Sequence, residues 1–146
     1  MAINQYPSNT IYVPRFGAYL SANFSPTANA WNNIVFNTGL PTYAGTSPLG
    51  YFTASGAVIT AYRSGLYLIN LHVQVSADSA VGITHSVDGW VALDRMNTVL
   101  GAVTVKALTY MSANNTCTMQ VYPYTAGTTV TGGATATKYT VAYLGT

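Results

Sequence analysis

Charge is scarce in this sequence, and the scarcity excludes several classes of protein. Only 5% of the 146 residues are charged, against about a quarter in an ordinary globular protein. Asp78, Asp88 and Asp94 are the only acidic residues, which leaves little room for the paired carboxylates of a glycosidase. The five basic residues are scattered, and none lies in the first 14 positions. We therefore expect no nucleic-acid interface and no arm that packages a genome.

Cysteine is almost absent as well. Cys117 is the only one, so the chain cannot form an internal disulfide, and the alternating apolar residues around it predict a buried, unreactive thiol. His72 and His85 lack the short spacing and the additional His or Cys residues of a zinc site. No serine stands in the sequence context of a nucleophile. We expect no catalytic residue, no metal ligand and no cofactor, and therefore a chain that is not an enzyme.

Long hydrophobic runs are missing too. No apolar stretch approaches the length of about 20 residues that a transmembrane helix needs. The N-terminus also lacks the basic region and apolar run of a secretion signal. We expect a chain that is made in the cytoplasm of its host cell, is not secreted by the general route and does not insert into a membrane.

The residues that are abundant favour a folded β protein. Hydrophobic residues make up 49% of the chain, and 12 of the aromatic residues are tyrosines, which excludes a disordered chain. Short β-branched and aromatic runs alternate with clusters of Gly, Pro, Asn and Ser, and no convincing segment has a helical period. This pattern predicts an all-β fold, an antiparallel β-sandwich or jelly roll of about 8–10 strands. We assign residues 15–146 to one such domain and residues 1–14 to an extended N-terminal segment.

Individual strands are predicted from alternation of apolar and polar residues. They cover residues 15–24, 34–36, 57–62, 65–75, 83–87, 90–93, 103–111, 116–124 and 139–144, with a brief pairing near 51–53. The strand at 65–75 has the clearest alternation, and we expect it to be central. Asp88-Gly89 predicts a two-residue hairpin turn, and Asn114-Asn115 predicts a second hairpin between 103–111 and 116–124.

The order of these elements resembles the tumour necrosis factor and complement C1q superfamily of trimeric jelly rolls, in a viral or phage version. The similarity covers roughly residues 16–144 and is carried by Ile34-Val35-Phe36-Asn37, Ile59-Thr60-Ala61, Gly65-Leu66-Tyr67, Asp88-Gly89, the run from Met111 to Tyr122, and the closing strand from Tyr139 to Leu144. The chain departs from the family pattern at Tyr62 and Ser64, where prolines are usual, and at Val141, which is often Gly. The family fold alone does not identify a partner.

The resemblance implies a homotrimer whose inner sheets pack around a threefold axis. The implied interface is the sheet with the strands near 15–24, 65–75, 103–111 and 139–144, and its contact residues would be Leu66, Leu68, Tyr110, Tyr139 and Tyr143. Some C1q-like trimers bind calcium near the axis, and the three aspartates could each supply an oxygen ligand. Solvated loop and turn acids are the simpler interpretation of these residues.

These features together lead to the hypothesis of a non-enzymatic virion surface protein, a head fibre, decoration or spike that assembles as a homotrimer. A surface with so little charge favours association with identical neighbours. Residues 1–14 would then anchor the domain to a capsid or fibre protein.

Two other functions stay open. The first alternative is a C1q-like module that binds a receptor or glycan of the host surface through the loops 37–55 and 125–137, with Tyr122 and Tyr124 as a sugar-binding platform. A further alternative is a small jelly-roll capsid shell protein, which the missing basic arm disfavours.

Overall fold

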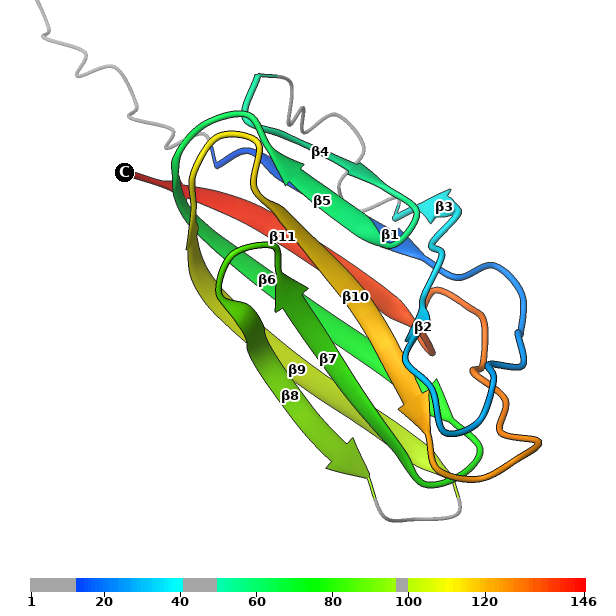
Figure 1. Ribbon diagram of the computed structural model, residues 1–146. Coiled ribbons are helices and arrows are strands. Elements are labelled where there is room, and N and C mark those ends of the chain that lie inside the picture. Colours follow the sequence, from blue (N-terminus) through cyan, green and yellow to red (C-terminus); the bar gives the residue numbers. More distant parts are fainter. Residues whose placement is uncertain (1–12, 41–49, 97–99) are drawn as a thin grey trace, which may run out of the picture.

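The computed structural model describes residues 13–40, 50–96 and 100–146, which form two antiparallel β-sheets packed face to face (Figure 1). The strands are β1 (Arg15–Tyr19), β2 (Asn32–Asn33), β3 (Thr38–Gly39), β4 (Phe52–Ser55), β5 (Val58–Ala61), β6 (Gly65–Val75), β7 (Ser79–His85), β8 (Gly89–Met96), β9 (Gly101–Met111), β10 (Thr116–Pro123) and β11 (Lys138–Gly145). One sheet, here the β6 sheet, has the order β3-β1-β11-β6-β9. The other, the β10 sheet, has the order β4-β5-β10-β7-β8, with β2 paired to β10. The predicted antiparallel β-sandwich is confirmed.

Strand β6 lies in the interior of its sheet, as its sequence predicts, although β11 is the middle strand. It pairs with β11 on one side and with β9 on the other. Its alternate side chains Tyr67, Ile69, Leu71, Val73 and Val75 are fully buried between the sheets. The predicted strands near 15–24, 65–75, 103–111 and 139–144 also lie together in this sheet, as β1, β6, β9 and β11.

The predicted hairpin across Asn114-Asn115 is wrong, because β9 and β10 belong to different sheets. Asn114 has a positive φ of 72°, and the backbone N–H of Ser112 donates to Asn115 Oδ1 at 2.9 Å. The turn is therefore real, but it carries the chain across the end of the sandwich. Met111 and Cys117 enter the same core from opposite sheets, with their sulfur atoms 3.8 Å apart. Alternation alone could not distinguish this crossing from a hairpin, since both strands present their apolar residues to one core.

The hairpin at Asp88-Gly89 is confirmed, but its turn differs from the predicted one. His85 pairs with Gly89, so the connection is the segment Ser86-Val87-Asp88. Gly89 alone of this turn has a positive φ, 77°. A longer loop that ends in a left-handed glycine is the next most common hairpin connection after the two-residue turns.

The N-terminal third has shorter strands than the sequence predicts. Strand β1 ends at Tyr19, and the predicted strand at 34–36 is replaced by the short β2, followed by an isolated bridge between Phe36 and Gly56. The loop after β10 packs against the segment beyond β1. A Cβ at Gly132 would lie 2.5 Å from the backbone of Ala22, so this approach requires glycine. Part of the 125–137 loop is thus built into the sandwich.

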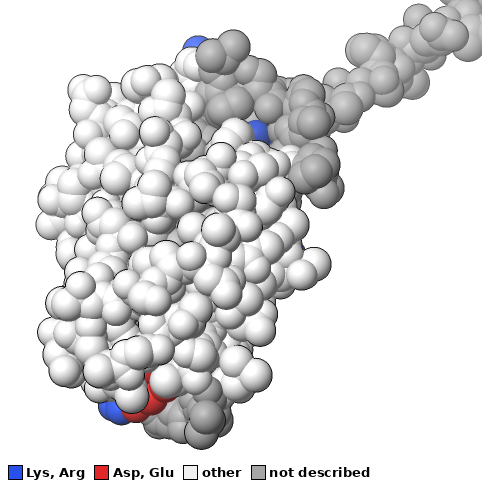
Figure 2. Space-filling model, turned by 90° about the vertical axis from the view of Figure 1, so that its right-hand side faces the viewer, with Lys and Arg blue, Asp and Glu red and all other residues white. Residues whose placement is uncertain are grey.

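Charged groups are sparse on the folded surface as they are in the sequence. Figure 2 shows one side of the molecule, on which charged atoms form only a few small spots. Among the described residues, no helix is long and apolar enough to cross a membrane. Burial of apolar surface and backbone hydrogen bonds therefore supply most of the stabilisation.

We predict that the Cys117 thiol of the native protein reacts with thiol reagents only when the sandwich unfolds. The side chain is fully buried, and burial raises the pKa of the thiol to about 12, so almost no reactive thiolate exists near neutral pH. Labelling followed by mass spectrometry should show slow modification without denaturant and rapid modification in it. Rapid labelling under native conditions would contradict the predicted burial.

Candidate assembly and binding surfaces

The His, Cys and Asp side chains of the described residues lie apart from one another or in pairs. No three or more of these described side chains gather in a group. His85 lies 3.1 Å from Asp88 Oδ2, and its Nδ1 also accepts the backbone N–H groups of Val87 and Asp88. These contacts tie the imidazole to the turn between β7 and β8, against which it lies buried.

The outer face of the β6 sheet is apolar at one end. Its side chains there are Leu66, Leu68, Leu108, Tyr110, Ala142 and Leu144, which we call the apolar patch. Leu68 lies directly between Leu108 on β9 and Ala142 on β11, and Leu66 is opposite Tyr110. Leu108 is 63% exposed and Tyr110 is 53% exposed. Contiguous exposed apolar side chains of this kind mark interaction surfaces.

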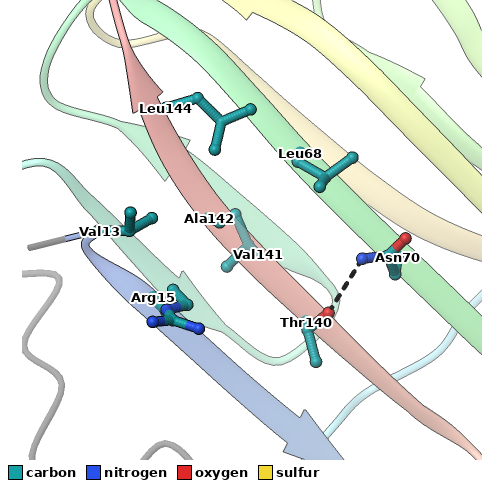
Figure 3. A pocket seen from close by; sticks show the side chains of 8 residues that line it. All are labelled: Val13, Arg15, Leu68, Asn70, Thr140, Val141, Ala142 and Leu144. Carbon is teal, nitrogen blue, oxygen red and sulfur yellow. Dashed lines mark hydrogen bonds between the residues drawn. The ribbon is translucent and has the colours of Figure 1, made fainter. Parts of the chain in front are cut away.

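A shallow pocket of about 330 Å³ begins at this patch and continues along β11 (Figure 3). Leu68, Ala142 and Leu144 line one part of it, and Val13 and Arg15 face them from the N-terminal side. Further along, the lining becomes polar, and Asn70 Nδ2 donates to Thr140 Oγ1 at 3.3 Å. The pocket therefore joins the apolar patch to a polar half of the same face.

The polar half of this face centres on His72. Its Nδ1 is hydrogen-bonded to Thr104 Oγ1 at 2.7 Å, and Lys138 is its register partner on β11. Burial of the imidazole and, secondarily, the charge of Lys138 lower the pKa of His72. Lys106 faces the neighbouring residue, Asn70, from β9. This half of the face therefore resists a further positive charge.

The predicted interface residues divide between this face and the core. Leu66, Leu68 and Tyr110 lie on the outer face, as expected. Tyr139 requires correction, because it is only 1% exposed and its ring packs against Phe36 with centroids 4.7 Å apart. Tyr143 points inward too, with its ring 5.2 Å from that of Tyr67.

Strand alternation explains these two corrections. Tyr139 and Tyr143 share the inward parity of Val141, whereas Ala142 and Leu144 lie on the outward face. The family resemblance indicates that the closing strand is aromatic, but it does not indicate which of its side chains face outward. Leu108 and Leu144 were missed, although the alternation along their own strands would have identified them.

The outer face of the β10 sheet has a row of aromatic side chains, Trp31, Trp90, Tyr122 and Tyr124, which we call the aromatic stripe. The ring centroids of Trp31 and Trp90 are 4.3 Å apart. Tyr122 lies 5.3 Å from Trp31 and 4.9 Å from Tyr124. The structure thus brings the two predicted ligand-binding tyrosines together and adds both tryptophans of the chain.

Small residues on β7 make room for this stripe. Ala80 and Gly82 are the register partners of Tyr122 and Gln120, and both are buried beneath larger neighbours. A Cβ at Gly82 would lie 2.5 Å from the Trp90 ring, so the indole rests on the bare backbone. Trp90 could have been assigned to the stripe from its place beside the hairpin turn. Trp31 could not, because it precedes a strand of only two residues.

An ion pair ends the stripe. Arg95 Nη2 lies 2.6 Å from Asp78 Oδ2, and the guanidinium carbon is 3.9 Å from the ring centroid of Tyr124. The hydrogen bond from Arg95 lowers the pKa of the Asp78 carboxyl. Both groups stay charged at neutral pH, and their charges cancel.

Two of the predicted segments, residues 1–14 and the loop 37–55, fall partly outside the described residues. The parts that lie outside are residues 1–12 and residues 41–49. The loop 125–137 is described, and its Thr128 and Thr137 side chains are buried. These two side chains are therefore not available for recognition.

Comparison with known proteins identifies the fold and leaves the family open. No protein-family model matches the sequence, and no curated protein sequence is significantly similar to it. A structure of murine APRIL matches with a TM-score of 0.68 and 10% identity, covering 89% of this chain and 99% of that one. The structure of Eiger TNF from S. frugiperda matches with a TM-score of 0.58 and 14% identity, covering 90% and 93%. The sandwich is therefore a TNF-like jelly roll.

We predict that the fold loses stability as the pH falls below about 6.5, the ordinary pKa of histidine. The lowered pKa of folded His72 means that the unfolded chain binds the proton more readily, so acid favours unfolding. Melting temperatures measured between pH 7 and pH 5 should fall by a few degrees, and His72→Gln should reduce the fall. An equal or larger fall in His72→Gln would assign the effect to other groups.

Proposed function

We propose that this chain is a non-enzymatic homotrimer displayed on the surface of a virus particle as a head fibre, decoration or spike protein. The observation that carries the trimer is the apolar patch on the outer face of the β6 sheet. A free protomer would hold these leucines and Tyr110 in water, at a cost that burial against identical copies removes. Closed cyclic symmetry satisfies such a patch on every copy.

The polar half of the same face is compatible with a threefold axis from which water is only partly excluded. Asn70, His72 and Thr104 can hydrogen-bond to water or to their copies, whereas Lys106 and Lys138 repel one another when copies approach. We infer that the apolar patch makes the close contacts and that the polar half stays solvated. The TNF-like jelly roll supports this proposal, because the sequence resembles a superfamily whose members form trimers.

The low charge of the chain supports a place on a particle surface. A neutral surface is poorly protected against association as a free monomer, whereas copies held on a shell are separated by their attachment points. The backbone N–H of Tyr143 donates to the carbonyl of Pro14 at 3.0 Å, so the chain enters the sandwich beside the end of its last strand. Anchoring through residues 1–14 would direct the opposite end, with Asp78, Arg95 and Tyr124, away from the shell.

The trimer is tested by one substitution in the apolar patch and a matched one on the other sheet. Leu108→Asp should convert the trimer to monomers, because a carboxylate buried at the contact costs several kcal/mol. Leu93→Asp should leave the trimer intact, since Leu93 is also exposed, at 54%, but lies on β8 of the β10 sheet. Sedimentation velocity at micromolar concentration measures both. A monomeric wild-type chain would refute the trimer.

The virion role is tested separately on particles. Antibodies against the folded domain should label intact particles of the virus that encodes the chain, as seen by immunoelectron microscopy. Mass spectrometry of purified particles should contain its peptides. If the peptides are absent from the particles, the virion role is wrong, whatever the oligomeric state. Peptides present without surface labelling would place the chain inside the shell and also contradict the proposal.

A further inference from the structure

We propose that the aromatic stripe of the β10 sheet is a binding site for neutral saccharides, whose pyranose rings stack on Trp31, Trp90, Tyr122 and Tyr124. All four residues lie on one protomer, so this inference goes beyond the trimer and virion proposals and does not rest on either. It extends the pair Tyr122 and Tyr124, singled out from the sequence, to a continuous site.

The exposure of both tryptophans is the first argument. Trp31 is 36% exposed and Trp90 is 42% exposed, although the core has room for large aromatic side chains such as Tyr67 and Tyr139. Exposing such large apolar rings costs free energy, and a bound partner that covers them recovers it. Their pairing at 4.3 Å makes one contiguous surface rather than two isolated exposed residues.

The stripe is also held rigid before any ligand arrives. Trp90 lies on Gly82, and Tyr122 is fixed between Trp31 and Tyr124. The segment that carries Trp31 is fastened by the Asn32 side chain. Asn32 Nδ2 donates to the carbonyls of Thr27 at 2.9 Å and Ala30 at 2.8 Å, and its Oδ1 accepts the N–H of Thr27. Rings ordered in advance bind with less loss of conformational entropy.

Polar groups flank the rings where a saccharide needs hydrogen-bonding partners. Gln120 Nε2 donates to Asn33 Oδ1 at 2.9 Å on the same face of the sheet. Each carboxamide has two donor hydrogens and an oxygen with two lone pairs, so this single bond leaves capacity for ligand hydroxyls. Gln120 is the register partner of Gly82, which places the amide pair next to the tryptophans.

The charge balance favours a neutral ligand. Arg95 stacks on Tyr124 but is paired with Asp78, so the stripe has no net charge with which to attract sulfates, sialic acids or phosphates. Nucleic acid, which also stacks on aromatic rings, needs a positively charged groove. A protein partner is the remaining competitor. The open row of rings along a sheet face fits successive sugar rings better than the enclosed pockets typical of protein hot spots.

The test uses the full chain and a panel of neutral oligosaccharides, comprising oligomers of glucose, galactose, mannose and N-acetylglucosamine. Both tryptophans of the chain lie in the stripe, so intrinsic tryptophan fluorescence reports binding directly. We expect at least one oligomer to change the fluorescence saturably and to bind equally well when salt is raised. Trp31→Ala and Trp90→Ala should each weaken binding by about tenfold or more, measured by calorimetry.

Controls separate loss of binding from loss of folding. Trp31→Phe and Trp90→Phe keep a ring and should retain most of the affinity, and Tyr62→Ala removes an aromatic side chain with 51% exposure outside the stripe and should bind as wild type. Circular dichroism and sedimentation of every variant check the fold and the oligomer. If the wild-type trimer forms but binds no saccharide of the panel, the saccharide proposal is wrong and the trimer proposal is unaffected. Binding that survives both Trp31→Ala and Trp90→Ala also overturns the saccharide proposal.

Discussion

The buried layer between the two sheets determines which side chains the molecule presents to its surroundings. Successive residues of a strand point to opposite faces, so each residue fixed in the core also fixes its neighbours outside. Tyr67 and Ile69 are buried, and Leu66 and Leu68 therefore lie on the outer face of β6. In the same way, burial of Met119 and Val121 turns Gln120 and Tyr122 outward on β10. Both candidate surfaces are thus consequences of one core.

The two surfaces have different chemistry because their neighbouring strands differ. On the β6 sheet, Leu68 lies between Leu108 and Ala142 of the two adjacent strands, so the outward side chains there are mostly aliphatic. On the β10 sheet, β7 lies between β10 and β8 and has only Ala80 and Gly82 at the outward positions beneath the rings. Bulky aromatic side chains from both sides can therefore lean inward and meet. The two partners that we propose, a second copy of the chain and a saccharide, differ in the same way as the faces that would bind them.

The sequence was sufficient to predict the long strands and their burial, because β6 and β10 alternate without interruption. It was insufficient where a turn could lead either to a hairpin or to the other sheet, as at Asn114, since local residue preferences do not encode sheet membership. The prediction that Tyr139 is an interface residue was wrong for a different reason. It followed from the aromatic residue type, whereas the alternation of side chains along β11 places Tyr139 in the core. Trp31 could not have been placed in any site, since its position depends on a two-residue strand and on the Asn32 side chain.

Gly82 and Trp90 lie on neighbouring strands, and the size of one limits the size of the other. Because the Trp90 indole occupies the volume that any Cβ at position 82 would need, a side chain at position 82 requires a smaller residue at position 90. In related sequences, we would expect a larger residue at position 82 to occur with the loss of the indole at position 90. Positions 82 and 90 would then covary, while the leucines on the opposite face could be substituted independently of them.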